Sequence, residues 1–403
     1  MAAVAKVLFQ ASLRTKTSYE QKTERKSMQR TGVASLPLHG GKAPAWLTGR
    51  MRKLAREIST IIIDEYGTDT LLNRLSDPYW FQAFGCVLGY DWHSSGVTTV
   101  VTGILKQALS PEEHGLAVCG GKGRTSRQTP AEIAKNSETF GFSDNHIENL
   151  AYTSRMTAKV DNTAIQAGYQ LYHHAFIIAE NGKWAVIQQG MSAEDRTARR
   201  YHWLSDTTQS LIVEPHNAVV GTKRAQALNM TAKESEGSRK ASVDIAKEPT
   251  GRIMRLLETA RPLHQKSLGE WLPKTSDNPW QQHFETLNMP RNINWNTMKR
   301  AYDFQPRNYE ELLSLKGVGP ATVRGLALVA EIVYGEKPSW EDPVKYSFAY
   351  GGKDGVPFPV NRSAMDESIS LLRDTVKAAK IGDKEKTRSL QSLRRFVPEN
   401  AKP

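Results

Sequence analysis

The chain has 403 residues, 39% of them hydrophobic, and a formal net charge of +12 at pH 7. No apolar run approaches the ~20 residues of a membrane-spanning helix, so we expect a soluble, cytoplasmic protein with no membrane partner. Cys86 and Cys119 are the only cysteines, which excludes a disulfide framework or a cysteine zinc cage and favours a reducing compartment.

The positive charge is concentrated near the N-terminus. Residues 1–56 hold twelve Lys or Arg and two Glu, a net charge of +10, so the rest of the chain carries only +2. Such a basic arm favours a polyanion, and we expect DNA as the partner. Residues 1–27 are predicted to be a disordered basic extension, and a plain solvated tail is the alternative.

Residues 28–220 are expected to form a mixed α/β domain that carries the catalytic site. An Asn181-Gly182 pair between two apolar runs predicts a β-hairpin over 175–190. The spacing of apolar residues predicts the other elements, which are helices over 47–66, 68–75 and 98–109, a strand within 84–101, and further strands over 116–119, 198–203 and 210–213.

A glycine-rich, basic loop follows the strand at 116–119. Lys122 and Arg124 stand among glycines there, and Thr129-Pro130 then opens a helix. Glycines allow close approach of a phosphate, and the two cations supply charge. The loop therefore either contacts phosphate or is a plain flexible loop.

The character of the chain changes after residue 220. Residues 221–251 are rich in Lys, Glu, Ser and Ala, which predicts a linker or a solvated helix. Residues 252–403 are expected to form an all-helical DNA-binding domain. The overall prediction is thus an α+β chain in which a sheet-containing domain precedes a helical one.

A helix-hairpin-helix is predicted over 308–333. Its turn reads Lys316, Gly317, Val318, Gly319 and Pro320, followed by Ala321 and Thr322. Two glycines permit positive φ angles, and the amides at the start of the second helix can bind a DNA phosphate without reading a base. A tight turn that serves only packing is the alternative.

Lys159 and Asp161 are candidate catalytic residues. In an extended segment these two side chains would point the same way, so the acid could orient the amine. A lysine with a lowered pKa can attack a carbon centre and form a Schiff base. An ordinary salt bridge is the alternative.

Aromatic and amide side chains follow this pair and are suited to stacking on a flipped base and bonding its edge. The predicted base pocket comprises Tyr169, Tyr172, His173, His174, Gln188, Gln189 and His93. No histidine occurs at the spacing of a known metal motif, so we expect no metal and no cofactor.

Asp342 is the third catalytic candidate. Helix-hairpin-helix DNA glycosylases keep an essential Asp at a similar distance beyond the hairpin, and Asp342 follows the predicted second helix. Their bifunctional members also carry a Lys just after the second glycine. Ala321 occupies the corresponding place here, so only the Asp can be carried over.

Six motifs together resemble the prokaryotic domain-of-unknown-function family 763. They lie at 30–44, 90–96, 119–123, 158–162, 316–324 and 351–357, and the resemblance covers about 28–400. It implies a nucleoid-associated DNA-repair protein with DNA-glycosylase activity on oxidised pyrimidines such as 5-hydroxyuracil. A structure-specific nuclease and a non-catalytic DNA-binding protein remain as alternatives.

Overall fold

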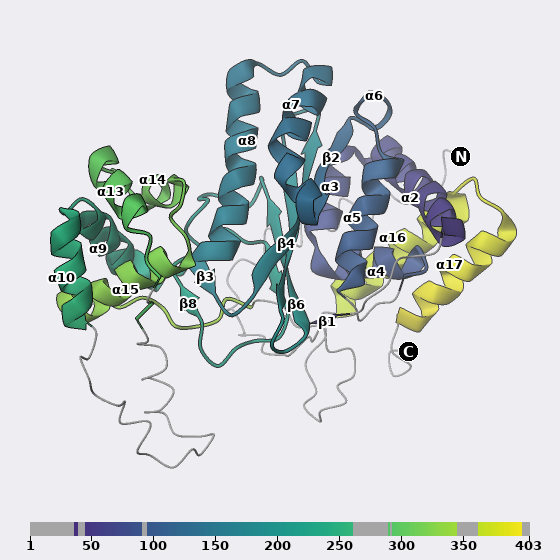
Figure 1. The fold of residues 1–403 in the computed structure, drawn as a ribbon. Helices are drawn as coiled ribbons and strands as arrows, with labels where there is room; N and C mark the ends of the chain where they lie inside the picture. The colour runs from purple at the N-terminus through teal and green to yellow at the C-terminus, as the bar shows by residue number, and fades with distance from the viewer. Residues whose placement is uncertain are drawn as a thin grey trace, which may run out of the picture. The chain divides into compact units, whose positions relative to one another are not determined.

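The computed structural model describes residues 36–38, 45–90, 95–260, 289–290, 292–344 and 362–396, all within one compact unit. Its main element is an antiparallel sheet with strand order β1-β6-β5-β4-β2, in which β7 also pairs with β6 (Figure 1). The strands are β1 (Leu36–Pro37), β2 (Leu116–Lys122), β4 (Gln170–Ala179), β5 (Trp184–Ser192), β6 (Thr197–Leu204) and β7 (Ala218–Val220). The α+β prediction is confirmed.

The central hairpin forms where Asn-Gly predicts it. β4 and β5 pair antiparallel through Ile178 and Trp184, and Gly182 adopts a φ of +84° in the turn between them. The side chain of Asn181 accepts a hydrogen bond from the amide of Lys183 at 3.0 Å, which stabilises the turn.

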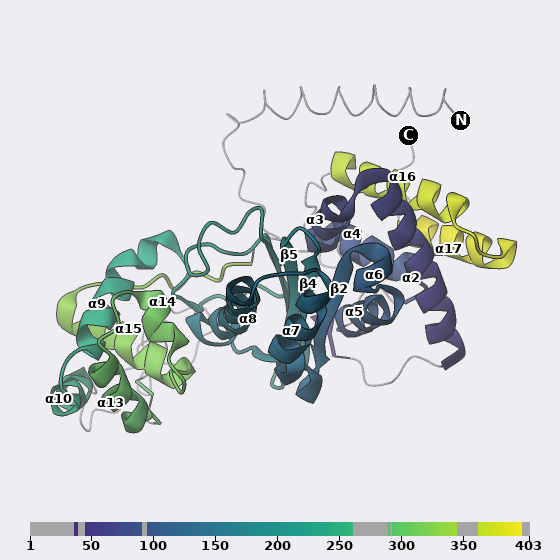
Figure 2. The same ribbon diagram turned by 90° about the horizontal axis from the view of Figure 1, so that it is seen from above.

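One face of the sheet is covered by helices from both ends of the chain. Ile177 and Ile187 of the sheet share a buried cluster with residues of α2 and α5, and with Leu372 of α16. Figure 2 shows α2 to α5 on this side, with α16 and α17 against them. The helices are α2 (Ala45–Tyr66), α3 (Thr68–Ser76), α4 (Pro78–Val87), α5 (Gly96–Ala108), α6 (Pro111–His114), α16 (Arg362–Ala378) and α17 (Asp383–Phe396).

The other face packs against α7 (Thr129–Thr139) and α8 (Asp144–Lys159) (Figure 2). Phe176 of β4 and Ile133 of α7 belong to a second buried cluster, which continues into the helices that follow the sheet. Those helices are α9 (Glu236–Ala246), α10 (Thr250–Ala260), α13 (Trp295–Phe304), α14 (Tyr309–Ser314) and α15 (Pro320–Tyr334). None of the described helices is both long and apolar enough to cross a membrane.

The prediction of a strand within 84–101 is wrong, because residues 84–87 form the last turn of the helix α4. Asp77 caps this helix by accepting from the amide of Tyr79 at 2.7 Å, and Pro78 occupies its first position. The helix is apolar on all sides because it is buried on all sides, and such a run does not reveal its period. The strand expected over 210–213 is likewise a series of bends.

The segment 221–251 is not a linker. It contains β8 (Leu228–Asn229), which pairs with β3 (Ile165–Gln166), and the helix α9, which packs on α15. Ser238, Ser242 and Ala246 are buried on α9, where their small side chains allow close helix packing. The Ser and Ala residues that suggested a solvent-exposed segment therefore lie in a buried helix–helix contact.

Candidate functional site

The turn between α14 and α15 has the sharp bend that its glycines predict. Gly317 has a φ of +96°, whereas Gly319 has a φ of −126° and ψ of −175°, which is extended backbone that any residue adopts. A Cβ at Gly317 would lie 2.4 Å from Thr297 Oγ1, while at Gly319 the nearest atom would be 3.9 Å away. Only Gly317 therefore requires glycine, and the expectation of positive φ at both positions is wrong.

The surface of this turn consists mainly of backbone and one cation. Lys316 is exposed and Ala321 is half-buried, whereas Val318 and Thr322 are only 1% and 2% exposed. The first amides of α15 have no carbonyl partner within the helix, because an α-helix leaves its first N–H groups unpaired. Among the predicted DNA contacts here, amides and Lys316 can reach a phosphate, but the side chains of Val318 and Thr322 cannot.

Two side-chain hydrogen bonds join this turn to the end of α8 and the strand β3 that follows. Lys159 Nζ donates to the carbonyl oxygen of Leu315 at 3.2 Å, and Gln166 Nε2 donates to the carbonyl oxygen of Pro320 at 2.8 Å. The catalytic candidate Lys159 and the predicted phosphate-binding turn are therefore adjacent, although 156 residues separate Lys159 from Leu315.

A cleft of about 470 Å³ opens beside Lys159 along α8. Several of the predicted site residues line this cleft. The basic side chains of Arg127 and Arg155, which were not among the predicted site residues, line it as well. The lining residues are Ser126, Arg127, Pro130, Ser154, Arg155, Ala158, Lys159, Asn162, Thr163, Leu171, Tyr172, His173 and His174. Arg155 lies four residues before Lys159 on α8, and this helical spacing is a signal that could have found Arg155.

Burial lowers the pKa of Lys159 below its ordinary value of 10.5. Desolvation disfavours the ammonium form, and the resulting larger fraction of free amine makes Lys159 a better nucleophile. Its side chain is half-buried at the wall of the cleft. The lowered pKa that a lysine nucleophile requires therefore comes from burial.

The predicted pairing of Lys159 with Asp161 is wrong. The chain is not extended here, because α8 continues into a π-helical turn over Val160–Ala164. Helical geometry separates residues i and i+2 on the circumference, so Asp161 points away from Lys159 and into the core. Asp161 is fully buried there and accepts hydrogen bonds from Gln188 and, at 3.0 Å, from Trp203 Nε1, while its other oxygen contacts His216.

The predicted base-pocket residues divide between the two faces of the sheet. His174 pairs with Gln188 and His173 with Gln189 across β4 and β5, and consecutive strand residues point to opposite faces. His174 and Gln188 face α8, whereas His173 bonds Thr102 of α5 at 2.9 Å and Gln189 bonds Thr98. A single pocket containing all four side chains does not form.

A buried histidine on the α5 face gives a prediction of pH dependence. Desolvation, with contributions from His174 and Lys122, lowers the pKa of His173 from 6.5 to about 3. The folded state thus keeps His173 neutral, whereas the unfolded chain binds a proton below pH 6.5. The free energy of unfolding therefore decreases as the pH is lowered, by up to about 1.4 kcal/mol per pH unit. His173→Gln should make this dependence shallower by up to about 1.4 kcal/mol per pH unit between about pH 3 and 6.5, as measured by urea unfolding.

The measurement has an internal reference, because burial also lowers the pKa values of His174 and His202. These two histidines should preserve part of the pH dependence of stability in the His173→Gln variant. An unchanged slope in His173→Gln would mean that His173 is protonated in the folded state.

Tyr169 and Asp342 lie together but away from the cleft-lining residues. The guanidinium of Arg199 stands 4.5 Å from the ring centroid of Tyr169 and donates to Asp342 Oδ2 at 2.5 Å. Both members of the Arg199–Asp342 pair have fully buried side chains, and the amide of Arg224 also donates to Asp342 at 2.7 Å. Asp342 was predicted to lie beside a substrate, but in the structure it forms a buried ion pair with Arg199.

The glycine-rich loop is partly filled by side chains of the neighbouring helices α7 and α5. The amide of Gly120 donates to Glu132 Oε2 at 2.6 Å, and Lys106 Nζ reaches the same oxygen at 2.6 Å. A carboxylate thus occupies the place that a phosphate would take at Gly120. Lys122 and Arg124 are exposed farther along, with Lys122 Nζ 5.8 Å from the ring centroid of Tyr172 at the cleft.

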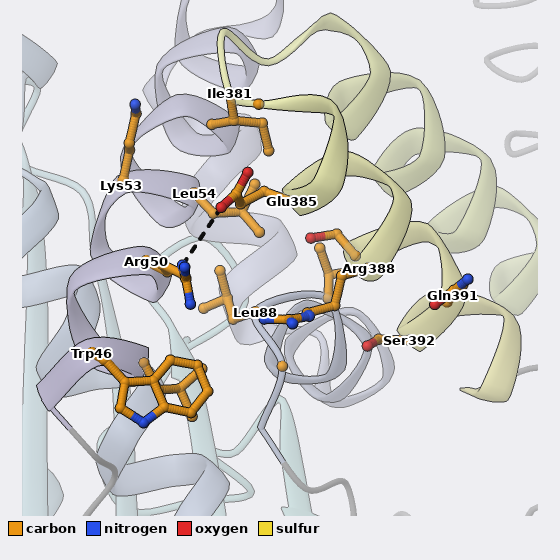
Figure 3. A pocket seen from close by; sticks show the side chains of 15 residues that line it. Trp46, Arg50, Lys53, Leu54, Leu88, Ile381, Glu385, Arg388, Gln391 and Ser392 are labelled. Atoms are coloured by element: carbon orange, nitrogen blue, oxygen red, sulfur yellow. Dashed lines mark ion pairs between the residues drawn. The ribbon is translucent and has the colours of Figure 1, made fainter.

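A second cleft of about 480 Å³ lies between α2, the end of α4, and α17 (Figure 3). Its rim is basic and includes Arg50, which stands 3.5 Å from Glu385 and 5.4 Å from the ring centroid of Trp46. None of the predicted site residues lines it. His93 lies in the segment 91–94, which is outside the described residues, as are 1–27 and the motif 351–357.

Comparison with protein families identifies a family for most of the chain. The family model described as Protein of unknown function (DUF763) matches residues 32–360, which is most of the chain and includes the cleft and the α14–α15 turn. No curated protein and no solved structure matches the chain.

Proposed function

The chain belongs to the DUF763 family, and on this premise we propose that it is a DNA glycosylase that excises a damaged pyrimidine at the α8 cleft. The observation that carries the proposal is the position of Lys159. Its amine, with a pKa lowered by burial, lies at the wall of the cleft and donates to the turn that is suited to hold a DNA phosphate.

The α14–α15 turn would hold the DNA backbone. Amides at the N-terminus of α15, together with the exposed Lys316, suit a phosphate and carry no base preference. Arg127 and Arg155 at the cleft would neutralise neighbouring phosphates as the strand follows α8.

The cleft would receive the flipped nucleotide. Tyr172 offers an aromatic ring, and Asn162 an amide, on the wall that Lys159 also lines. As Lys159 Nζ forms a bond to C1′, the C1′–N1 bond breaks and the base leaves with the bonding electron pair and a proton. The lone pair of the lysine nitrogen then expels O4′, which takes a proton from water to become a hydroxyl, and a protonated Schiff base joins the lysine to the open sugar.

One gel experiment tests this function against its alternatives. Duplex DNA containing 5-hydroxyuracil is incubated with the protein with and without EDTA, and half of each sample is then treated with alkali. Cleavage that resists EDTA, alone or after alkali, is the result expected for base excision. Cleavage that EDTA abolishes would identify a nuclease, and a mobility shift without cleavage would identify a binding protein.

The nuclease alternative needs clustered metal ligands. Within the described segments, no group of three or more His, Cys, Asp or Glu is arranged to hold a metal ion. The EDTA arm of the gel decides this alternative for the complete chain.

Two glycine variants test the role of the turn in DNA binding. Gly317→Ala should weaken binding to duplexes of any sequence, because its positive φ and the contact with Thr297 force the turn to change, at a cost of about 1–3 kcal/mol. Gly319→Ala is the matched control, since its extended backbone and open surroundings accept a methyl group. Equal affinity of both folded variants and the parent, measured by fluorescence anisotropy, would remove the turn from the DNA-binding surface.

A further inference from the structure

A continuous row of side-chain hydrogen bonds runs from the α8 cleft into the core. Ser154 Oγ lies 2.9 Å from His174 Nε2, and His174 Nδ1 lies 2.7 Å from Gln188 Oε1. Gln188 in turn contacts Asp161. All four residues are at most 5% exposed, and Ser154 and His174 form part of the cleft wall.

The orientation of the Gln188 amide is fixed by its neighbours. Its Nε2 faces two acceptors, the carbonyl oxygen of Thr157 at 3.0 Å and Oδ2 of Asp161. The amide oxygen of Gln188 has no hydrogen to donate to these acceptors, so the NH₂ group must lie on this side. The Oε1 atom of Gln188 therefore faces His174.

This orientation determines the proton on His174. Because Gln188 Oε1 only accepts, His174 Nδ1 must carry the hydrogen that it donates. Burial lowers the pKa of His174, so the ring is neutral near pH 7 and its Nε2 has a free lone pair. That lone pair accepts the hydroxyl hydrogen of Ser154, which is the geometry of a hydroxyl poised to lose its proton.

Asp161 cannot take a proton from the cleft by itself. Gln188 and Trp203 donate to one of its oxygens, and His216 contacts the other. Its negative charge nevertheless raises the pKa of His174 and so stabilises an imidazolium. Asp161 thus acts on the cleft only through Gln188 and His174.

We propose that His174 is the proton-transfer group of the α8 cleft and acts through the hydroxyl of Ser154, with Gln188 and Asp161 as positioning residues. The role of the pair in base excision rests on the proposed function. As Lys159 Nζ bonds to C1′, its proton passes to Ser154 Oγ while the proton of Ser154 passes to His174 Nε2. When the proton on His174 returns through Ser154 to the departing base, Ser154 is again a hydroxyl and His174 is again neutral.

The charges around His174 suit a transient proton acceptor. Arg127, Arg155 and Lys159 line the same cleft, and Lys122 lies on the neighbouring strand. Burial disfavours a lasting positive charge on the imidazole, whereas Asp161 on the buried side favours it. His174 is therefore neutral at rest and can be charged briefly during transfer.

The kinetic test compares two buried serines. Ser154→Ala should slow single-turnover excision of 5-hydroxyuracil by about 10²- to 10⁴-fold, the usual contribution of a proton-transfer group, with DNA affinity unchanged. Ser137→Ala is the matched control, because Ser137 is fully buried on α7 and its hydroxyl has no hydrogen-bond partner in the described structure. Excision by Ser154→Ala at the rate of the parent and of Ser137→Ala would overturn the proposal.

A spectroscopic test does not depend on the activity. Long-range ¹⁵N–¹H NMR spectra of the full chain, assigned with His174→Gln, should report a neutral ring protonated on Nδ1 near pH 7, and Gln188→Leu should lose this preference. A charged ring or a proton on Nε2 in the parent would overturn the proposal. If the parent excises no base, the proposed function fails, and this spectrum still decides the state of the Ser154–His174 pair.

Discussion

Replacement of Lys159 by alanine is expected to abolish the adduct that borohydride traps between the protein and damaged DNA. Borohydride reduces a Schiff base to a stable amine, and Lys159 is the cleft lysine whose pKa burial lowers. Excision should slow by about 10³-fold or more, because an amine nucleophile has no substitute in an alanine side chain. The trapped adduct is measured on a denaturing gel and excision in single turnover.

Lys135→Ala is the matched control for this experiment. It removes the same charge from the exposed surface of α7 without changing the cleft lining, so the adduct should persist. An adduct of undiminished yield in folded Lys159→Ala would assign the amine elsewhere. If the parent excises the base but forms no adduct, water is the nucleophile.

Replacement of Asp342 by asparagine is expected to lower the free energy of unfolding by about 3–5 kcal/mol. The substitution removes the carboxylate that neutralises Arg199, and both side chains are fully buried. The charge of Arg199 would then lie in the core without an anion, which costs far more than the loss of a surface pair. Urea unfolding monitored by circular dichroism measures the change.

Asp206→Asn is the control, because Asp206 pairs with Lys183 where both side chains are more than a third exposed. Water and salt screen such a pair, so its loss should change stability little. A stable Asp342→Asn variant that binds DNA but does not excise would contradict the structural role and return Asp342 to the catalytic candidates.

Local patterns predicted the elements that local chemistry determines. The Asn181-Gly182 turn, the apolar runs of β4 and β5, and the apolar face of α2 each specify their conformation within a few residues. The same reasoning failed where burial is uniform, as in α4, or where small residues serve packing, as in α9. In both helices the deciding contacts come from segments distant in sequence.

The candidate site was predicted in part. Lys159, Tyr172 and His174 were selected from sequence and line one cleft, whereas the ring of His173 bonds Thr102 on the α5 face. The partner assigned to Lys159 was wrong because a π-helical turn replaced the extended segment that the pairing required. Ser154 gave no local signal, because a serine within a helix is ordinary until His174 from β4 lies 2.9 Å from it.

The sequence by itself determined the α+β class, the family, the β-hairpin and the glycine turn, because each depends on backbone preferences or motifs within a short window. Only the tertiary structure decided that Asp342 pairs with Arg199, that Asp161 is buried behind Gln188, and that Lys159 reaches the turn at Leu315. These outcomes follow from strand alternation, helix register and the burial of charges between segments more than twenty residues apart. The sequence of each segment alone does not specify which side chains of other segments it will contact.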